Sequence, residues 1–210
     1  MDRILFNPEW FFSEKLKEKI SLKIPFFVLL IYGIFGTASM VLLSNKITAS
    51  LPSNLGQIMF VGVAVGAIGS LIGVYLIWLI LAGVFHLISN LFCSEGTFKR
   101  TFEFVGYGFL PLIFSSMINL GALYTILPSL DFSFNDPSLI QQNANQMLFN
   151  PIFQASQVAG ILFSIWSAYI WIFAIKNALK ITTKNALIVV GVPIGLYDLY
   201  LIYNILIHVI

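Results

Sequence analysis

Asp198 is the residue of this sequence whose type and position are best suited to chemistry. It lies about 12 residues into the last long apolar segment, which as a helix places it roughly 18 Å from the start of that segment. An acid at that depth in a bilayer costs about 2.5–3.5 kcal/mol and normally faces a bundle interior or a cavity. No Lys or Arg lies at a comparable depth. We therefore expect Asp198 to be either protonated and hydrogen-bonded, or in contact with a cation or water.

Further polar side chains occupy a similar depth in the other apolar segments. Counted along helices, they lie about 20 Å from the same edge: Thr37, Ser115, Ser116 and Gln157. If all of them face inward, they form a polar layer with Asp198. Two roles for this layer stay open: a proton- or cation-binding point, or a neutral carboxyl that hydrogen-bonds between helices.

The sequence indicates no catalytic, cofactor-binding or metal site. Cys93 is the single cysteine, which excludes an internal disulfide and a Cys-based zinc cluster. His86 and His208 fall near opposite faces of the membrane, so they do not converge on a metal. No Gly-x-Ser-x-Gly elbow and no phosphate-binding Gly-Lys-Ser/Thr loop is found. We expect neither an enzyme nor a cofactor.

The composition is that of an integral membrane protein. Of the 210 residues, 59% are hydrophobic and only 10% are charged, whereas soluble domains carry about 25% charged residues. The mean hydropathy is +0.92. With a net charge of +2 and scattered basic residues, the chain shows no nucleic-acid footprint. The expected partner is the lipid bilayer.

Apolar segments long enough to cross a bilayer as helices define the predicted fold. We place the spans at about 24–43, 58–92, 102–127, 152–175 and 186–207. The second is uncharged and too short for two crossings with a turn, so we expect one long tilted helix. Residues 1–23 predict a cytoplasmic amphipathic helix on the membrane surface, which starts at Asn7-Pro8 and carries Phe12 and Leu16 on one side. The predicted fold is an all-α integral membrane protein: a five-transmembrane-helix bundle, residues 24–210, with an N-terminal amphipathic interfacial helix.

Positive charge is unequally shared between the two sides of this arrangement. All but one of the 11 Lys and Arg residues lie in the N-terminal segment, the bend after the second span or the turn after the fourth. Lys46 is the exception. Because Lys and Arg in short loops stay cytoplasmic, the N-terminus is expected inside and the C-terminus outside.

A glycine stripe in the second span predicts close packing. Gly62, Gly66, Gly69 and Gly73 recur at helical spacing, and such a face allows a neighbouring helix to approach closely. A homo-oligomer or a membrane-protein partner is the expected consequence. The alternative is that glycine is simply commoner in membrane helices.

Several local motifs resemble the Yip family, named for Ypt/Rab-GTPase-interacting membrane proteins. The first is Asn7-Pro8-Glu9 with Phe11-Phe12 before the first span, and another is the Lys-rich turn before the last span. The remainder are Gly96-Thr97-Phe98-Lys99, which leads into the third span, and Tyr107 followed by Pro111 within it. This region is a candidate cytoplasmic loop, with the site residues Gly96, Lys99, Arg100, Glu103, Tyr107 and Pro111.

The resemblance implies five membrane helices, a cytoplasmic N-terminus and self-association. Eukaryotic members organise vesicle traffic between endoplasmic reticulum and Golgi, and carry a substantial soluble region before the first span. The short region in this sequence argues against GTPase binding and favours a compact bacterial or archaeal member in a prokaryotic cell membrane, with the endoplasmic reticulum or Golgi as the alternative. The leading functional hypothesis is a non-enzymatic protein that acts through helix packing and partner or self-association in membrane organisation. The alternative is a small permease, or a proton- or cation-conducting protein, centred on Asp198.

Overall fold

The computed structural model describes residues 2–49, 53–130 and 137–207. Throughout these ranges the regular secondary structure is helical, and 5 helices are long and apolar enough to cross a membrane. They confirm the predicted all-α, five-span bundle. The five are α3 (Lys23–Ala49), α4 (Ser53–Ser89), α6 (Leu110–Ile126), α8 (Pro151–Leu179) and α9 (Thr183–Ile207).

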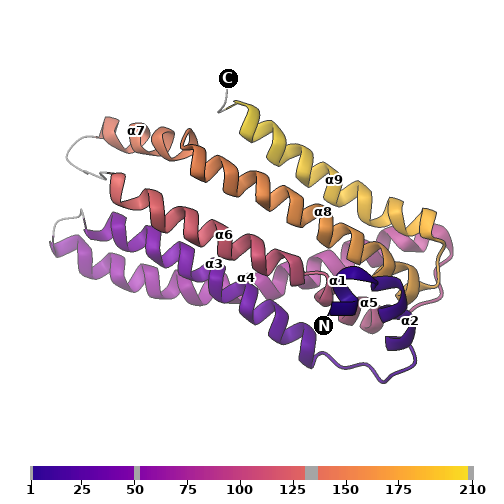
Figure 1. The fold of residues 1–210 in the computed structure, drawn as a ribbon. Coiled ribbons are helices and arrows are strands. Elements are labelled where there is room, and N and C mark those ends of the chain that lie inside the picture. The colour runs from indigo at the N-terminus through magenta and orange to yellow at the C-terminus, as the bar shows by residue number, and fades with distance from the viewer. Residues whose placement is uncertain (1, 50–52, 131–136, 208–210) are drawn as a thin grey trace.

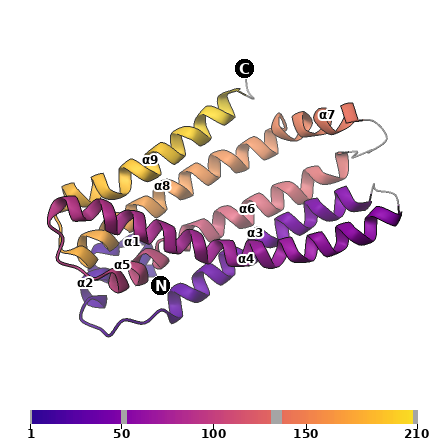
Figure 2. The same cartoon turned by 180° about the vertical axis from the view of Figure 1, so that it is seen from behind.

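The long helices run side by side, and short helices gather at the two ends of the bundle (Figures 1 and 2). One end carries α1 (Asp2–Phe6), α2 (Pro8–Lys15) and α5 (Phe98–Tyr107); we call it the basal end. The turn between α8 and α9 lies at the same end, whereas α7 (Pro137–Leu148) lies at the opposite one. Towards its C-terminus α9 diverges from α8.

The N-terminal segment forms two short helices, where the sequence predicted one. Asn7 starts α2 as expected, because its side-chain oxygen accepts a hydrogen bond from the Trp10 N–H at 3.2 Å. The helix ends at Lys15, so the predicted stack on one face is not formed: Phe12 is fully buried, whereas Leu16 is 37% exposed. Phe12 packs against the rings of Phe104 and Tyr107, and α2 therefore lies against the bundle.

The third span is broken, which corrects the prediction of one helix over residues 102–127 with Pro111 inside it. The chain forms α5, turns at Gly108 and restarts as α6. The Trp171 indole occupies the space beside Gly108, where an added Cβ would lie 2.7 Å from Trp171 Cε2. Pro111 falls in the first turn of α6. N–H groups in the first turn of a helix have no partner within the helix, so the absence of an N–H in proline breaks no hydrogen bond there. Pro111 therefore starts α6 and does not kink it.

The hydrophobic core is concentrated at the basal end. Large buried side chains of α2, α4, α5 and α8 meet there, including Phe12, Phe85, Phe104, Tyr107 and Trp171. Each fully buried side chain of this size stabilises the fold by about 1.5–3 kcal/mol. Along the long helices many apolar residues point outward, such as Ile58 and Phe60 at 69% and 70% exposed. This distribution fits a lipid-facing surface.

Candidate functional site

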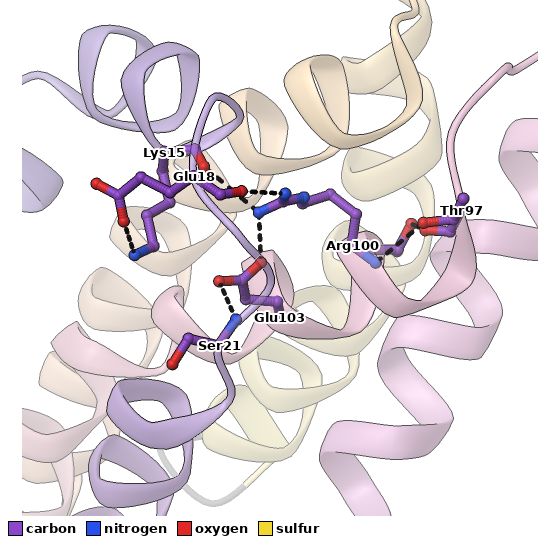
Figure 3. Close-up of polar contacts among 7 residues, drawn as sticks. Lys15, Glu18, Ser21, Thr97, Arg100 and Glu103 are labelled. Atoms are coloured by element: carbon purple, nitrogen blue, oxygen red, sulfur yellow. Dashed lines mark hydrogen bonds and ion pairs between the residues drawn. The ribbon is translucent and has the colours of Figure 1, made fainter.

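A buried carboxylate joins α5 to the N-terminal segment. Glu103 is 0% exposed, and both of its side-chain oxygens are hydrogen-bonded (Figure 3). Arg100 Nη1 donates to Glu103 Oε2 at 2.7 Å, and the backbone N–H of Ser21 donates to Oε1 at 3.0 Å. Because Ser21 follows α2 in the chain, Glu103 holds the connection between the N-terminal helices and the first span.

Arg100 extends this contact to the end of α2. Its Nη2 donates to the Glu18 carbonyl at 2.7 Å and its Nη1 to the Lys15 carbonyl at 3.4 Å. Carbonyl groups at a helix C-terminus lack helical partners, and a cation there also complements the helix dipole. Thr97 caps the start of α5 by accepting from the Arg100 N–H at 3.4 Å. We call Ser21, Arg100 and Glu103 the basal clamp.

Burial dominates the electrostatics of the basal clamp. Loss of solvation raises the pKa of Glu103, while the Ser21 N–H and Arg100 oppose that rise by stabilising the carboxylate. One helical turn further, burial and the nearby acids Glu103 and Glu18 raise the pKa of Tyr107 to about 12. The Tyr107 hydroxyl is buried and has no hydrogen-bond partner among the described residues.

Close backbone approach fixes α5 against its neighbours. A Cβ on Gly106 would lie 2.6 Å from Pro25 Cβ, and one on Gly96 would lie 2.7 Å from Leu179 Cα. The indoles of Trp78 and Trp171 donate to backbone carbonyls of α5 at 2.8 and 2.7 Å. These contacts make the basal end a rigid assembly of four sequence segments.

The candidate cytoplasmic loop is mostly helical. Gly96 lies in the turn before α5, and Lys99, Arg100, Glu103 and Tyr107 lie on α5 itself. Sequence reasoning expected these residues in a loop, whereas most of them lie on one helix. It did not identify Ser21 as their partner, because nothing in the local pattern links residues 82 positions apart.

A second candidate site is a cavity of about 570 Å³ inside the bundle, which we call the central cavity. Residues of α3, α4, α6, α8 and α9 line it. Ser115, Ser116 and Gln157, expected in a midplane polar layer, are all on its wall. The polar lining residues that sequence reasoning missed are Tyr32, Ser39, Asn119, Ser156, Ser164 and Tyr197.

Asp198 lies behind the wall of the central cavity. It is 8% exposed, and the side chain of Ser164, a lining residue, lies near its carboxyl group. Its Oδ1 atom is buried with no hydrogen-bond partner among the residues described. Thr37, expected in the same layer, lies apart because it faces α4, where its hydroxyl pairs with that of Ser70 at 2.6 Å.

The glycine stripe is largely open. A Cβ on Gly62, Gly69 or Gly73 would meet no atom within 4 Å, whereas Gly66 lies against the side chain of Met40 on α3. In the described part of the chain no group of three or more His, Cys, Asp or Glu residues is arranged to hold a metal ion. His86 hydrogen-bonds with Thr101 at 3.3 Å.

Comparison with known proteins places the sequence in a family. Residues 3–204 match the family model described as the Yip1 domain. An uncharacterized protein of the archaeon Methanocaldococcus jannaschii is 38% identical over 120 residues, which cover 57% of this chain and 85% of that protein. No solved structure matches the chain.

Proposed function

This chain belongs to the Yip1 domain family of multi-pass membrane proteins, and we propose that it works without enzymatic chemistry in membrane organisation. On this proposal it acts by helix packing and by association with a second copy or with a membrane-protein partner. The proposed orientation places the N-terminus in the cytoplasm and the C-terminus outside.

The uncovered glycine face of α4 is the observation that carries this proposal. Gly62, Gly69 and Gly73 have open space where a side chain would begin, and no residue of 2–49, 53–130 or 137–207 fills it. In lipid, where apolar side chains gain little by leaving the solvent, close backbone approach is a main source of helix association. A second helix can therefore reach the α4 backbone along this face.

Substitution of Gly69 tests the association. Because a Cβ at Gly69 meets no atom within 4 Å among the described residues, Gly69→Leu should leave the monomer folded and lower the dimer fraction. Gly121→Leu is the matched control, since Gly121 on α6 is also open. The measurement is energy transfer between differently labelled copies in liposomes over a range of protein-to-lipid ratios. Equal transfer for both variants, or a monomeric native protein at every ratio, contradicts self-association through α4.

The charge distribution supports the proposed orientation. Ten of the 11 Lys and Arg residues belong to segments at the basal end, and Lys46 lies in the last turn of α3, at the other end. The positive-inside rule then assigns the basal end to the cytoplasm.

The central cavity favours a second candidate function, a small permease or a proton- or cation-conducting protein. A buried acid next to a polar cavity is the usual arrangement of an intramembrane ion pathway. Flux of protons and monovalent cations into liposomes, compared between the native protein and Asp198→Ala, tests it. Flux that requires Asp198 supports conduction. If the flux of the native protein equals that of protein-free liposomes, the conduction hypothesis is wrong.

A further inference from the structure

We propose that the central cavity is a binding site for an organic ammonium ion, a small amine with an apolar body that carries N–H donors. This site goes beyond the proposed scaffold role and does not depend on self-association. Three properties of the wall point to this ligand class: the direction of its hydroxyl groups, the position of its one nearby acid, and its aromatic content.

The serine hydroxyls of the cavity act mainly as acceptors. Ser39, Ser116 and Ser156 donate their protons to backbone carbonyls of their own helices, at 3.1, 2.8 and 2.7 Å. A hydroxyl that has used its proton offers only lone pairs to a ligand. The wall therefore favours a molecule that donates hydrogen bonds over one that accepts them.

Ser164 connects this acceptor surface to a carboxyl group. It lines the cavity and lies near the carboxyl group of Asp198, whose Oδ1 is buried without a partner in the described residues. No Lys, Arg or His is among the lining residues. A cation in the cavity would thus face no positive charge among the lining residues. The Asp198 carboxyl behind Ser164 would attract it when ionised, and in a low-dielectric interior that attraction is weakly screened.

The remaining wall is aromatic and aliphatic. Tyr32, Phe109, Trp171 and Tyr197 all line the cavity, and aromatic faces attract ammonium groups, more so when the ions are desolvated. A volume of about 570 Å³ falls within the range of about 300–1,000 Å³ that is typical of small-molecule sites. A bare metal ion would leave most of that space and the whole apolar wall unused.

Three carboxamide and hydroxyl side chains complete the polar part. Ser115, Asn119 and Gln157 line the cavity and form no hydrogen bond with the described chain. The Ser115 Oγ atom lies 3.5 Å from where a Cβ on Gly160 would be, so it lies against α8 at the edge of the cavity. These groups can turn their oxygens to an ammonium without breaking an existing contact.

A pair of probes of the same shape tests the inference. The full chain in detergent is titrated with radiolabelled 2-phenylethylammonium and with 2-phenylethanol at neutral pH, and binding is measured by equilibrium dialysis. We expect the ammonium to bind at least about tenfold more tightly, because a charge-assisted hydrogen bond is about twice as strong as a neutral one. Asp198→Asn should remove this advantage, whereas Glu95→Gln, an exposed acid at the basal end, should retain it.

Competition identifies the source of the ammonium. Nanodiscs of phosphatidylethanolamine that displace the probe, where phosphatidylcholine nanodiscs do not, assign the site to an amine-bearing lipid headgroup. If neither lipid displaces the probe, the site is assigned to a free amine.

Three results would overturn the inference: equal affinity for the ammonium and the alcohol, no saturable ammonium binding up to its solubility, or displacement of the ammonium by Na⁺ or K⁺ alone. If Asp198→Asn does not fold, the ratio of the two native dissociation constants decides by itself.

Discussion

Removal of Arg100 should detach the N-terminal helices from the bundle. Arg100→Met leaves Glu103, which is 0% exposed, without its guanidinium partner at 2.7 Å. Breaking a buried ion pair from one side typically costs about 3–5 kcal/mol, because the remaining charge stays desolvated. Glu103 keeps the Ser21 N–H and the nearby Lys15 charge. We therefore expect a cost near the lower end, about 3 kcal/mol.

Replacing both Arg100 and Glu103 should lower the stability of the fold by less than the sum of the two single substitutions. In Arg100→Met with Glu103→Met no unpaired charge is left in the core, while the Glu18 carbonyl loses a donor at a position where water can replace it. Coupled pairs of this kind show interaction energies of about 0.5–3 kcal/mol. We expect the interaction energy between Arg100 and Glu103, measured with the double variant, to lie in the upper part of that range.

Hydrogen exchange of the amides in residues 2–22 is the direct assay, because the clamp acts on that segment. A loss of about 3 kcal/mol in local stability corresponds to roughly hundredfold faster exchange. Lys176→Met is the control: it removes the partly exposed ion pair with Glu9, and such pairs are worth about 1 kcal/mol or less. If Arg100→Met accelerates exchange no more than Lys176→Met does, the argument from a buried pair is wrong.

Further predictions concern packing, pH and orientation. Gly96→Ala should destabilise the fold by about 1–3 kcal/mol, because its Cβ would lie 2.7 Å from Leu179 Cα. Gly121→Ala, where the space is open, should stabilise the fold by about 0.5–1 kcal/mol. Thermal unfolding in detergent compares the two variants. Burial raises the pKa of Glu103 above its ordinary value of 4.5. Its contribution to stability is therefore present below pH 4.5 and is lost as the pH rises through the folded-state pKa. Glu103→Gln should remove that part of the stability profile, and an unchanged profile contradicts it. Cys93, which is exposed in the bend before α5, should react with an impermeant maleimide in inside-out vesicles but not in intact cells; the reverse result would invert the proposed orientation.

The sequence was sufficient to predict a bundle of five membrane-spanning helices. Long uncharged segments and the Lys/Arg distribution depend only on local composition, so they can be read without knowledge of contacts. The break between α5 and α6 could not be, because the indole that requires Gly108 comes from Trp171 on another helix. Burial of Glu103 has the same origin, since Ser21 reaches it from a separate segment.

The sequence predicted the depth of the cavity-lining residues in the membrane, but not the direction in which each side chain points. A rise of about 1.5 Å per residue places Ser115 and Gln157 at one level, and both line the cavity. The same count cannot say which way a side chain faces, and Thr37 turns to α4 instead. A usable signal was overlooked on α8, where Ser156, Gly160 and Ser164 recur every four residues and so share one face.

Assembly of the basal end has to wait for translation to approach its finish. Trp166 on α8 donates to the Leu5 carbonyl at 3.2 Å across 161 residues of chain. When the first two short helices leave the ribosome, the helix that they pack on has not been made. They must remain at the membrane surface until the fourth crossing is inserted, and only then can they dock. The docked N-terminus is thus a marker of a polypeptide inserted as far as α8, and a protease that recognises it undocked would select copies that lack this crossing.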